Sequence, residues 1–493
     1  MPLIKRILIV CYLFCGSSLF AQNVGIGTVS PNNSAQLDVQ SNSKGFLLPR
    51  MSTAERNAIA SPALGLLVFD TDKNCFLFFD GAKWNALAFV NENKVPLQGR
   101  QPLDATANQY FGSKVDISGD YAIVGAKNWS TNNMSNRGAA YIFYKGSGGW
   151  LQQAKLTPTD SAANDLYGGN VAIQGDYAVV SSPTKTNGRG KIYIYKRTGT
   201  SWGLEGSFTR TGGVTNDNFG FGLDIAINAN GVPVVFSGTP YSDLNGTDKG
   251  EVSMYIRNNT NGTWSLLQTI QAADVSSADN FGFNITAEGN YVAIAAPYQD
   301  AGGTNTGAVY IYLYNGTNYV LQQRLQGNTS GATFGLSIAL QGNLIAIGAP
   351  MAPLFANTSP AVYVYTRNNT TWTNTSQLYQ LNPSQAALNG VFGMSVAING
   401  SRLMIGMPGG IDFPNGTNIN YSGIIGTVYL YDHNGTGVYN SPAIRTLQAE
   451  SPTDGDLFGQ SLAINASGIY IIADNRVALA NLANVGAVFF GSW

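Results

Sequence analysis

The sequence predicts an all-β protein: a seven-bladed β-propeller closed by an N-terminal strand and preceded by a small β-rich module. Three observations predict this fold: a dipeptide that recurs seven times, a set of short apolar runs after each copy, and a last copy that is one run short. The dipeptide Phe-Gly, or once Tyr-Gly, begins at Phe111, Tyr167, Phe219, Phe281, Phe334, Phe392 and Phe458. The intervals of 56, 52, 62, 53, 58 and 66 residues are typical of propeller blades or other repeat arrays.

Each copy contains four runs of the strand type. In the first copy these runs are 114–117, 121–126, 139–144 and 150–156. β-Branched and aromatic residues dominate them, and Gly, Asn, Asp and Ser stand at the breaks. The runs are apolar on both faces more often than they alternate, as expected of a sheet that packs between two others. No segment predicts a long helix.

The last copy predicts how the ring closes. It has runs at 461–464, 469–472 and 486–490, but no fourth run follows. Residues 94–103 precede the first Phe-Gly as a fourth strand would, and Asp104 lies seven residues before it, as Asp160 and Asp274 do in later copies. We therefore expect this N-terminal stretch to complete blade seven and to leave no strand edge unpaired. Six blades with a separate cap is the alternative.

The repeat also has a family resemblance. Phe334-Gly335 followed by Gly348-Ala349-Pro350 resembles the FG-GAP repeat of integrin-type propellers, and related copies extend over nearly 400 residues. In integrin-like blades an aspartate-rich loop between the first two strands surrounds a calcium ion. Here the same connections are short turns such as 118–120 and 341–343, with one carboxylate at most. We expect no metal and no cofactor in them, and the resemblance implies protein or matrix-like ligands.

The N-terminal region predicts that the protein is exported from the cytoplasm. Residues 1–21 have the basic start, the apolar segment and the small residue Ala21 of a secretory signal peptide. The apolar segment is too short for a comfortable membrane span, so we expect a secreted or outer-cell-surface protein with no membrane span after signal removal. Cys75 is then the only cysteine of the mature chain, which excludes an internal disulfide.

Residues 22–90 form a predicted module of their own, and the propeller takes up 91–493. Two strand-like runs, 66–70 and 75–80, flank a turn, and Ser52 begins a predicted short helix through Ala60. The segment resembles the N-terminal module of many secreted Bacteroidota proteins and of tail-fibre-like proteins. It is predicted to be a spacer or an oligomerisation foot; a small cap packed on the main domain is the alternative.

Composition and charge exclude some partners. Charged residues make up 11% of the chain, against about 25% in typical soluble proteins. The formal net charge is -1, so no broad basic surface is available for nucleic acid or for an anionic membrane.

Residues able to carry catalysis are scarce. His433 is the one histidine and falls in a hairpin, so no histidine-based nucleophilic or zinc site is expected. Carboxylate pairs recur in the connections between blades, and we interpret them as turn caps rather than as the acid pair of a glycosidase. These pairs are Asp160 with Asp165, Asp274 with Asp279, and Asp454 with Asp456.

The connections between the second and third strands vary most in length and sequence, and propeller geometry places them on one face. We call this the variable-loop face. Aromatic side chains suited to stacking on a sugar ring or anchoring a protein surface occur there. The candidate ligand-binding residues are Trp129, Tyr241, Tyr298, Phe355, Phe413 and Tyr421; alternatively, these side chains fold inward to stabilise the loops.

The sequence thus predicts a non-catalytic binding or adhesion scaffold that recognises an extracellular protein or glycan. A polysaccharide-acting enzyme that uses loop carboxylates is one alternative, and a structural component of a fibre or envelope assembly is another.

Overall fold

The computed structural model describes residues 23–72, 75–86, 97–131, 133–351, 359–379, 391–412, 418–420, 424–433, 438–439, 443–449, 456–478 and 482–493. They fall into two compact units, Met1–Glu92 and Asn93–Trp493. The predicted signal peptide lies outside the described residues. Within the described part of the chain, no helix has the length and apolar character needed to cross a membrane.

The first unit is small and mostly β. Strand β1 (Val24–Ile26) pairs in parallel with β2 (Leu37–Val39), and a second sheet has the order β3 (Arg50–Met51), β4 (Leu67–Asp70), β5 (Cys75–Phe79) and β6 (Trp84–Ala86). Helix α2 (Thr53–Asn57) begins at Ser52 through a capping box with Glu55. The helix ends before the predicted Ala60, and Ser61 has a φ of 49° ahead of Pro62.

The second unit contains seven four-stranded antiparallel sheets within the described residues. The first three sheets are β8 (Phe111–Ser118), β9 (Tyr121–Ala126), β10 (Ala139–Gly146) and β11 (Gly149–Leu156); β12 (Val171–Gln174), β13 (Tyr177–Ser182), β14 (Lys191–Thr198) and β15 (Ser201–Phe208); and β16 (Leu223–Ile227), β17 (Pro233–Thr239), β18 (Glu251–Arg257) and β19 (Trp264–Ile270).

The other four sheets are β20 (Asn284–Glu288), β21 (Tyr291–Ala296), β22 (Ala308–Tyr314) and β23 (Tyr319–Gln326); β24 (Ser337–Gln341), β25 (Leu344–Ala349), β26 (Ala361–Asn368) and β27 (Thr371–Tyr379); β28 (Ser395–Asn399), β29 (Arg402–Met407), β32 (Thr427–Asp432) and β33 (Arg445–Leu447); and β34 (Ser461–Ile464), β35 (Ile469–Asp474), β36 (Ala487–Ser492) and β7 (Gln98–Arg100).

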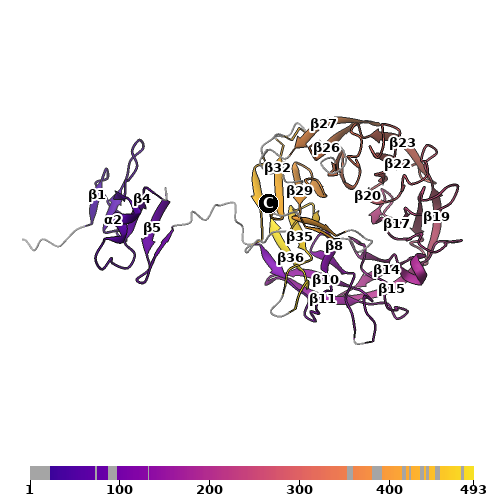
Figure 1. The fold of residues 1–493 in the computed structure, drawn as a ribbon, viewed down its shortest axis with the longest axis horizontal. Coiled ribbons are helices and arrows are strands. Elements are labelled where there is room, and N and C mark those ends of the chain that lie inside the picture. The colour runs from indigo at the N-terminus through magenta and orange to yellow at the C-terminus, as the bar shows by residue number, and fades with distance from the viewer. Residues whose placement is uncertain are drawn as a thin grey trace, which may run out of the picture. The chain divides into compact units, whose positions relative to one another are not determined.

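These sheets form a ring (Figure 1). The first strand of each sheet contacts the first strand of the next, in the order β8, β12, β16, β20, β24, β28 and β34, and β34 contacts β8 again. The unit is therefore a β-propeller, as the sequence predicts, with each four-stranded sheet as one blade.

The ring closes through the predicted N-terminal strand. Strand β7 pairs antiparallel with β36, with Gly99 opposite Phe489. Two side chains of β7 also hold the neighbouring blade: Gln98 Oε1 accepts a hydrogen bond from Trp150 N at 3.0 Å, and Arg100 Nε donates to Trp150 O at 2.6 Å. Sequence-distant ends of the propeller are thus joined by main-chain pairing and by side chains.

The opening Phe-Gly of each copy has the structural role that the repeat indicates. Phe111 is fully buried and packs edge-on against Tyr141 of its own blade, with a ring separation of 5.4 Å. It belongs to a core cluster that also contains Ile471 and Val488 of the last blade. The opening aromatic residues therefore fill the space between neighbouring blades.

In six of the seven blades, a glycine directly before the third strand makes room for the opening residue of the next blade. Gly138 has a φ of +83°, and a Cβ there would lie 2.0 Å from the carbonyl oxygen of Tyr167. Only glycine combines this left-handed backbone with such close backbone approach.

Aromatic residues at the head of the fourth strand in the first five blades pack on the preceding blade. Trp150 stacks on Phe490 with ring centroids 4.2 Å apart, and Trp372 meets Tyr291 edge-on at 6.2 Å. Both tryptophans are buried. The recurrence of these residues is therefore due to packing between blades.

The variable connections contain some regular structure that the sequence did not predict. Residues 408–424 include a small hairpin of β30 (Gly410–Asp412) and β31 (Asn418–Asn420). Residues 183–189 include the four-residue element α3 (Lys185–Gly188), in which Thr186 and Asn187 have left-handed backbone with φ of 55° and 59°. Both are too short to give a recognisable hydrophobic period.

Candidate functional site

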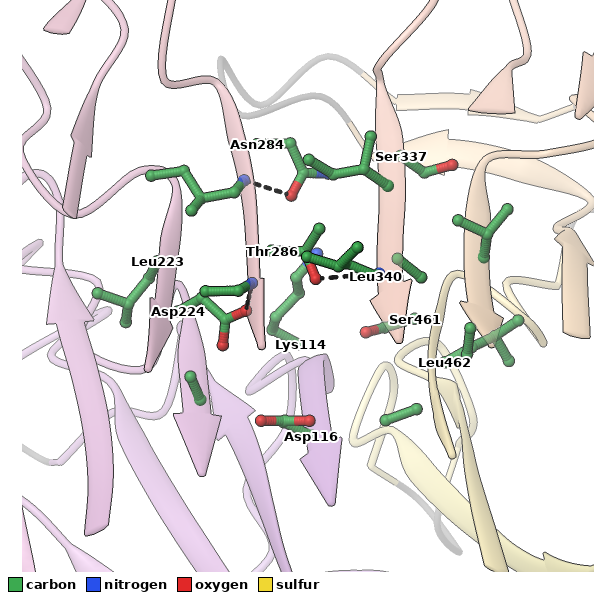
Figure 2. Close-up of a pocket in the computed structure, with 18 of the residues that line it drawn as sticks. Lys114, Asp116, Leu223, Asp224, Asn284, Thr286, Ser337, Leu340, Ser461 and Leu462 are labelled. Atoms are coloured by element: carbon green, nitrogen blue, oxygen red, sulfur yellow. Dashed lines mark hydrogen bonds between the residues drawn. The ribbon is translucent and has the colours of Figure 1, made fainter. Parts of the chain in front are cut away.

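A cavity of about 700 Å³ runs through the centre of the propeller and is lined by the innermost strands of all seven sheets. Side chains alternate along these strands. In β8, Val115 and Ile117 are buried between blades, whereas Lys114, Asp116 and Ser118 are partly exposed to the cavity. Figure 2 shows Lys114, Asp116 and Asp224 on the cavity wall.

Two aspartates in the cavity join neighbouring blades. Asp116 Oδ2 accepts a hydrogen bond from Ile173 N of the next blade at 2.7 Å, and Oδ1 accepts one from Ile117 N at 2.8 Å. Asp224 repeats this arrangement two blades later, where its Oδ2 accepts from Ala287 N at 2.7 Å. Each carboxylate therefore fixes the position of two adjacent inner strands.

Other polar side chains of the inner strands also bond to the next blade. The contacts are Asn284 Nδ2 to Leu336 O at 3.0 Å, Ser337 Oγ to Gly393 O at 2.7 Å, Ser395 Oγ to Gly459 O at 2.6 Å, Asn465 Nδ2 to Gly119 O at 2.7 Å, and Leu340 N to Thr286 Oγ1 at 3.3 Å. The last of these is drawn in Figure 2. Buried polar groups that are satisfied in this way make the wall of the cavity rigid.

Lys114 differs from this pattern. Within the described residues its ammonium group has no hydrogen bond and no ion pair, although Asp116 and Asp224 are near enough to act on it electrostatically. Burial lowers the pKa of Lys114, and the two aspartates oppose that shift. Burial raises the pKa of Asp116 to about 6 and that of Asp224 well above its usual range. Three interacting ionisable groups thus share one wall of the cavity.

Four aromatic side chains gather on two neighbouring blades at one end of the inner strands. We call Phe221, Phe283, Tyr241 and Tyr298 the aromatic cluster. Phe221 lies 4.7 Å from Phe283 and 5.6 Å from Tyr241, and Phe283 lies 5.8 Å from Tyr298, measured between ring centroids. All four line the cavity and are partly exposed.

The local sequence explains why these rings meet. Phe221 and Phe283 directly follow the Phe-Gly of their copies, just before β16 and β20, while Tyr241 and Tyr298 follow a proline at the ends of β17 and β21. The entry to a first strand and the exit from a second strand lie at the same edge of a blade. The cluster therefore belongs to the variable-loop face.

The predicted ligand-binding residues have different surroundings. Tyr241 and Tyr298 belong to the aromatic cluster. Trp129 is absent from the cavity lining; it packs against the core of the first blade, with Lys155 Nζ 3.2 Å from its ring centroid. Phe355, Phe413 and Tyr421 lie outside the described residues.

Sequence reasoning missed Phe221, Phe283, Lys114, Asp116 and Asp224. The charged residues Lys114, Asp116 and Asp224 could have been recognised from the sequence by comparing the seven copies of the repeat. Five residues after the opening aromatic residue, most copies carry Ala or Thr, and Asp occurs in only two of them. Three residues after it, Lys occurs once. Departures from the repeat mark residues that the blade itself does not require.

Two of the carboxylates in the connections between blades do not cap turns but bond to side chains of the following blade: Asp160 to Lys191 Nζ at 2.9 Å and Asp274 to Arg324 Nε at 3.1 Å. Asp165 and Asp279 do act as turn caps. Asp165 Oδ2 accepts a hydrogen bond from Ala162 N at 2.7 Å, and Asp279 Oδ2 accepts one from Ser276 N at 2.6 Å. Asp454 lies outside the described residues. In the described part of the chain, no three His, Cys, Asp or Glu side chains are close enough together to hold a metal ion.

His433 is partly buried. Its ring packs edge-on against Tyr439 at 5.0 Å. It lies at the hairpin after β32 and does not line the cavity.

The family models that match the chain agree with its architecture. Residues 25–98 match the model of a phage tail like trimerisation region, and residues 101–143, 150–195 and 264–312 match the FG-GAP repeat. No curated protein sequence matches the chain. Similar solved structures include Sqt1 of Saccharomyces cerevisiae, at 11% identity over 80% of this chain and 97% of that one with a TM-score of 0.42.

A putative 6-phosphogluconolactonase from Bacteroides uniformis is also similar, at 13% identity over 69% of this chain and 86% of that one with a TM-score of 0.45. The repeat matches all fall within the ring of antiparallel sheets, and the other match falls almost wholly in the first unit. The chain therefore carries FG-GAP repeats that build a β-propeller, preceded by a module similar to a phage-tail-like trimerisation region.

Proposed function

We propose that the protein is a secreted or surface-displayed, non-catalytic scaffold that binds an extracellular protein or glycan through the variable-loop face of its propeller. The aromatic cluster is the observation that carries this proposal. Partly exposed aromatic rings grouped beside a cavity are the usual anchors of protein and ligand recognition.

The cluster also offers polar atoms for a ligand. Neither the Tyr241 hydroxyl nor the Tyr298 hydroxyl makes a hydrogen bond within the described residues. Burial raises the pKa of Tyr241 to about 12, with a smaller effect from Tyr298. Both hydroxyls therefore stay protonated at neutral pH and can donate to a ligand. The aromatic residues that recur at the fourth strands, such as Trp150 and Trp372, pack between blades instead.

We further propose that the N-terminal module assembles several copies of the scaffold. Nine exposed large apolar side chains lie between Val24 and Leu67, among them Phe46 at 64% and Leu47 at 74% exposure. A unit of this size buries little apolar surface by itself, and association of identical modules would cover these residues. The match to a trimerisation region supports this arrangement. Several propellers on one foot would bind a repetitive surface with increased avidity.

The binding proposal is tested with the full chain on arrays of glycans and extracellular proteins. The variant Tyr298→Ala removes one ring of the aromatic cluster and is expected to lower the signal of the bound ligand at least tenfold. Tyr144→Ala is the control, because Tyr144 is 38% exposed at the end of β10 and does not line the cavity. Equal loss with both variants, or retention with both, would contradict the proposal.

The oligomer proposal is tested by light scattering on the full chain and on the double variant Phe46→Ser, Leu47→Ser. We expect the parent to be an oligomer and the variant to shift toward the monomer. A parent that stays monomeric at high concentration would rule out this role of the module.

A polysaccharide-acting enzyme remains the second candidate function, and one observation favours it. Asp116 and Asp224 are two carboxyl groups in one cavity with raised pKa values, and paired acids of this kind perform glycoside hydrolysis. Against it, each carboxylate already holds two backbone N–H groups. Release of reducing ends from polysaccharides by the parent, abolished in Asp224→Asn, would establish the enzyme and displace the scaffold.

A further inference from the structure

We infer that the cavity binds the end of an uncharged glycan chain. One sugar ring lies against the aromatic cluster, and the next ring lies beside Lys114, Asp116 and Asp224. This inference rests on the proposed binding function and names its ligand class and the residues that select it. The cavity volume of about 700 Å³ lies within the range of small-molecule sites.

The two parts of the site have a spacing that suits linked sugar rings. Phe221 lies two residues before the inner strand β16, Asp224 is the second residue of that strand, and both line the cavity. Three residues of chain span at most roughly 10 Å, so the backbone of Phe221 in the aromatic cluster lies within about that distance of Asp224 in the charged wall, the name we give to Lys114, Asp116 and Asp224. Two linked pyranose rings cover such a distance, whereas a single small ion or a metal does not.

The hydrogen-bonding groups of Lys114, Asp116 and Asp224 are suited to a ligand that carries hydroxyl groups. The Lys114 ammonium has donors without partners in the described residues. Each Asp116 and Asp224 oxygen accepts one backbone N–H and keeps further acceptor capacity. A hydroxyl is the group that can accept from an ammonium and donate to a carboxylate at once. A polyol such as a sugar therefore satisfies both sides of the wall.

The charges of the wall select against charged ligands. An anionic sugar attracted by Lys114 would also face Asp116, Asp224 and Glu288, all of which line the cavity. An amino sugar attracted by the carboxylates would face the Lys114 ammonium. Because Lys114, Asp116, Asp224 and Glu288 place groups of both charge signs in one cavity, a ligand of either charge meets at least one group of its own sign. Desolvating a neutral ligand there costs least.

The probes are neutral disaccharides (lactose, maltose, cellobiose and diacetylchitobiose), a uronic acid disaccharide and glucosamine. Binding to the full chain is measured by saturation-transfer NMR and calorimetry. We expect at least one neutral disaccharide to bind and the charged sugars to bind at least tenfold more weakly. The variants Lys114→Met and Lys114→Gln should weaken neutral binding about tenfold, whereas Lys145→Met, at the hairpin end of β10, should leave it unchanged.

Folding of each variant is checked by circular dichroism, and the second Lys114 variant keeps the test valid when one of them fails to fold. Preference for the charged sugars, or neutral binding that neither Lys114 variant changes, would overturn the inference. Array binding that is lost in Tyr298→Ala, combined with no binding of any free sugar, would overturn the inference and leave the binding scaffold intact. Loss of both readouts would reject the two proposals together.

Discussion

The seam between β7 and β36 offers the sharpest test of the fold. In the double variant Gln98→Ala, Arg100→Ala the closing strand keeps its main chain but loses both side-chain contacts to Trp150. The matched control is Gln323→Ala, because Gln323 makes the same pair of contacts with Trp372 inside the ring, at 2.7 Å to its N and 2.9 Å to its O. The two variants remove equivalent bonds, but only the first removes them at the seam.

The magnitude follows from the number of bonds. Each hydrogen bond contributes about 1 kcal/mol net, and each partly buried partner left unsatisfied adds a cost of roughly 1 kcal/mol or more. Two bonds therefore correspond to a loss of about 2 to 4 kcal/mol in the free energy of unfolding. Strand β7 has only three paired residues, so the loss at the seam is expected to open this strand before the rest of the propeller unfolds.

The assay is amide hydrogen exchange with mass spectrometry, combined with urea unfolding. Both variants should lower the unfolding midpoint, but only the double variant should accelerate exchange in β7 and in β36 around Val488–Phe490. Unchanged protection of β36 in the double variant, or equal acceleration in the Gln323→Ala control, would refute the reasoning that β7 seals the ring.

Two further predictions concern single residues. Gly138→Ala should destabilise the propeller by more than about 3 kcal/mol, because the added Cβ would clash with the Tyr167 carbonyl oxygen. The control Gly119→Ala should cost only about 1 kcal/mol, because Gly119 has a φ of +56° but open space around it. Equal unfolding midpoints of the two variants in urea would contradict this prediction. Burial raises the pKa of Asp474 to about 7. Because the folded state then holds a proton that the unfolded state releases above about pH 4, stability from this group should fall as pH rises from 4 to 7, by up to roughly 4 kcal/mol. Asp474→Asn should flatten that decline, and a parallel pH profile in the variant would show that Asp474 does not cause it.

Much of the propeller could be predicted from local sequence. The runs predicted for the first copy correspond to β8 through β11, and 461–464 is β34 in full. The closing strand was predictable because a copy with three runs leaves an edge that another segment must cover. The hairpin of β30 and β31 and the end of α2 were not predicted, since elements of three to five residues carry no period.

The candidate site could be predicted only in part. Tyr241 and Tyr298 were named as candidates from the sequence because they place large aromatic groups in the variable connections, and whether they bind a ligand stays a prediction. Phe221 and Phe283 were missed because an aromatic residue after Phe-Gly looks like one more packing residue. Lys114 was missed because a single lysine at the start of a strand usually indicates a solvated edge.

The sequence by itself determined the repeat, the strands within it and the residues that each blade must bury, because these follow from side-chain alternation and turn chemistry over short distances. Only the tertiary structure decided which partly exposed side chains share a space. Lys114 and Asp224 are 110 residues apart in the chain and line one cavity because ring closure brings all first strands to a common axis. That convergence depends on the packing of every blade on the next, which no single segment encodes.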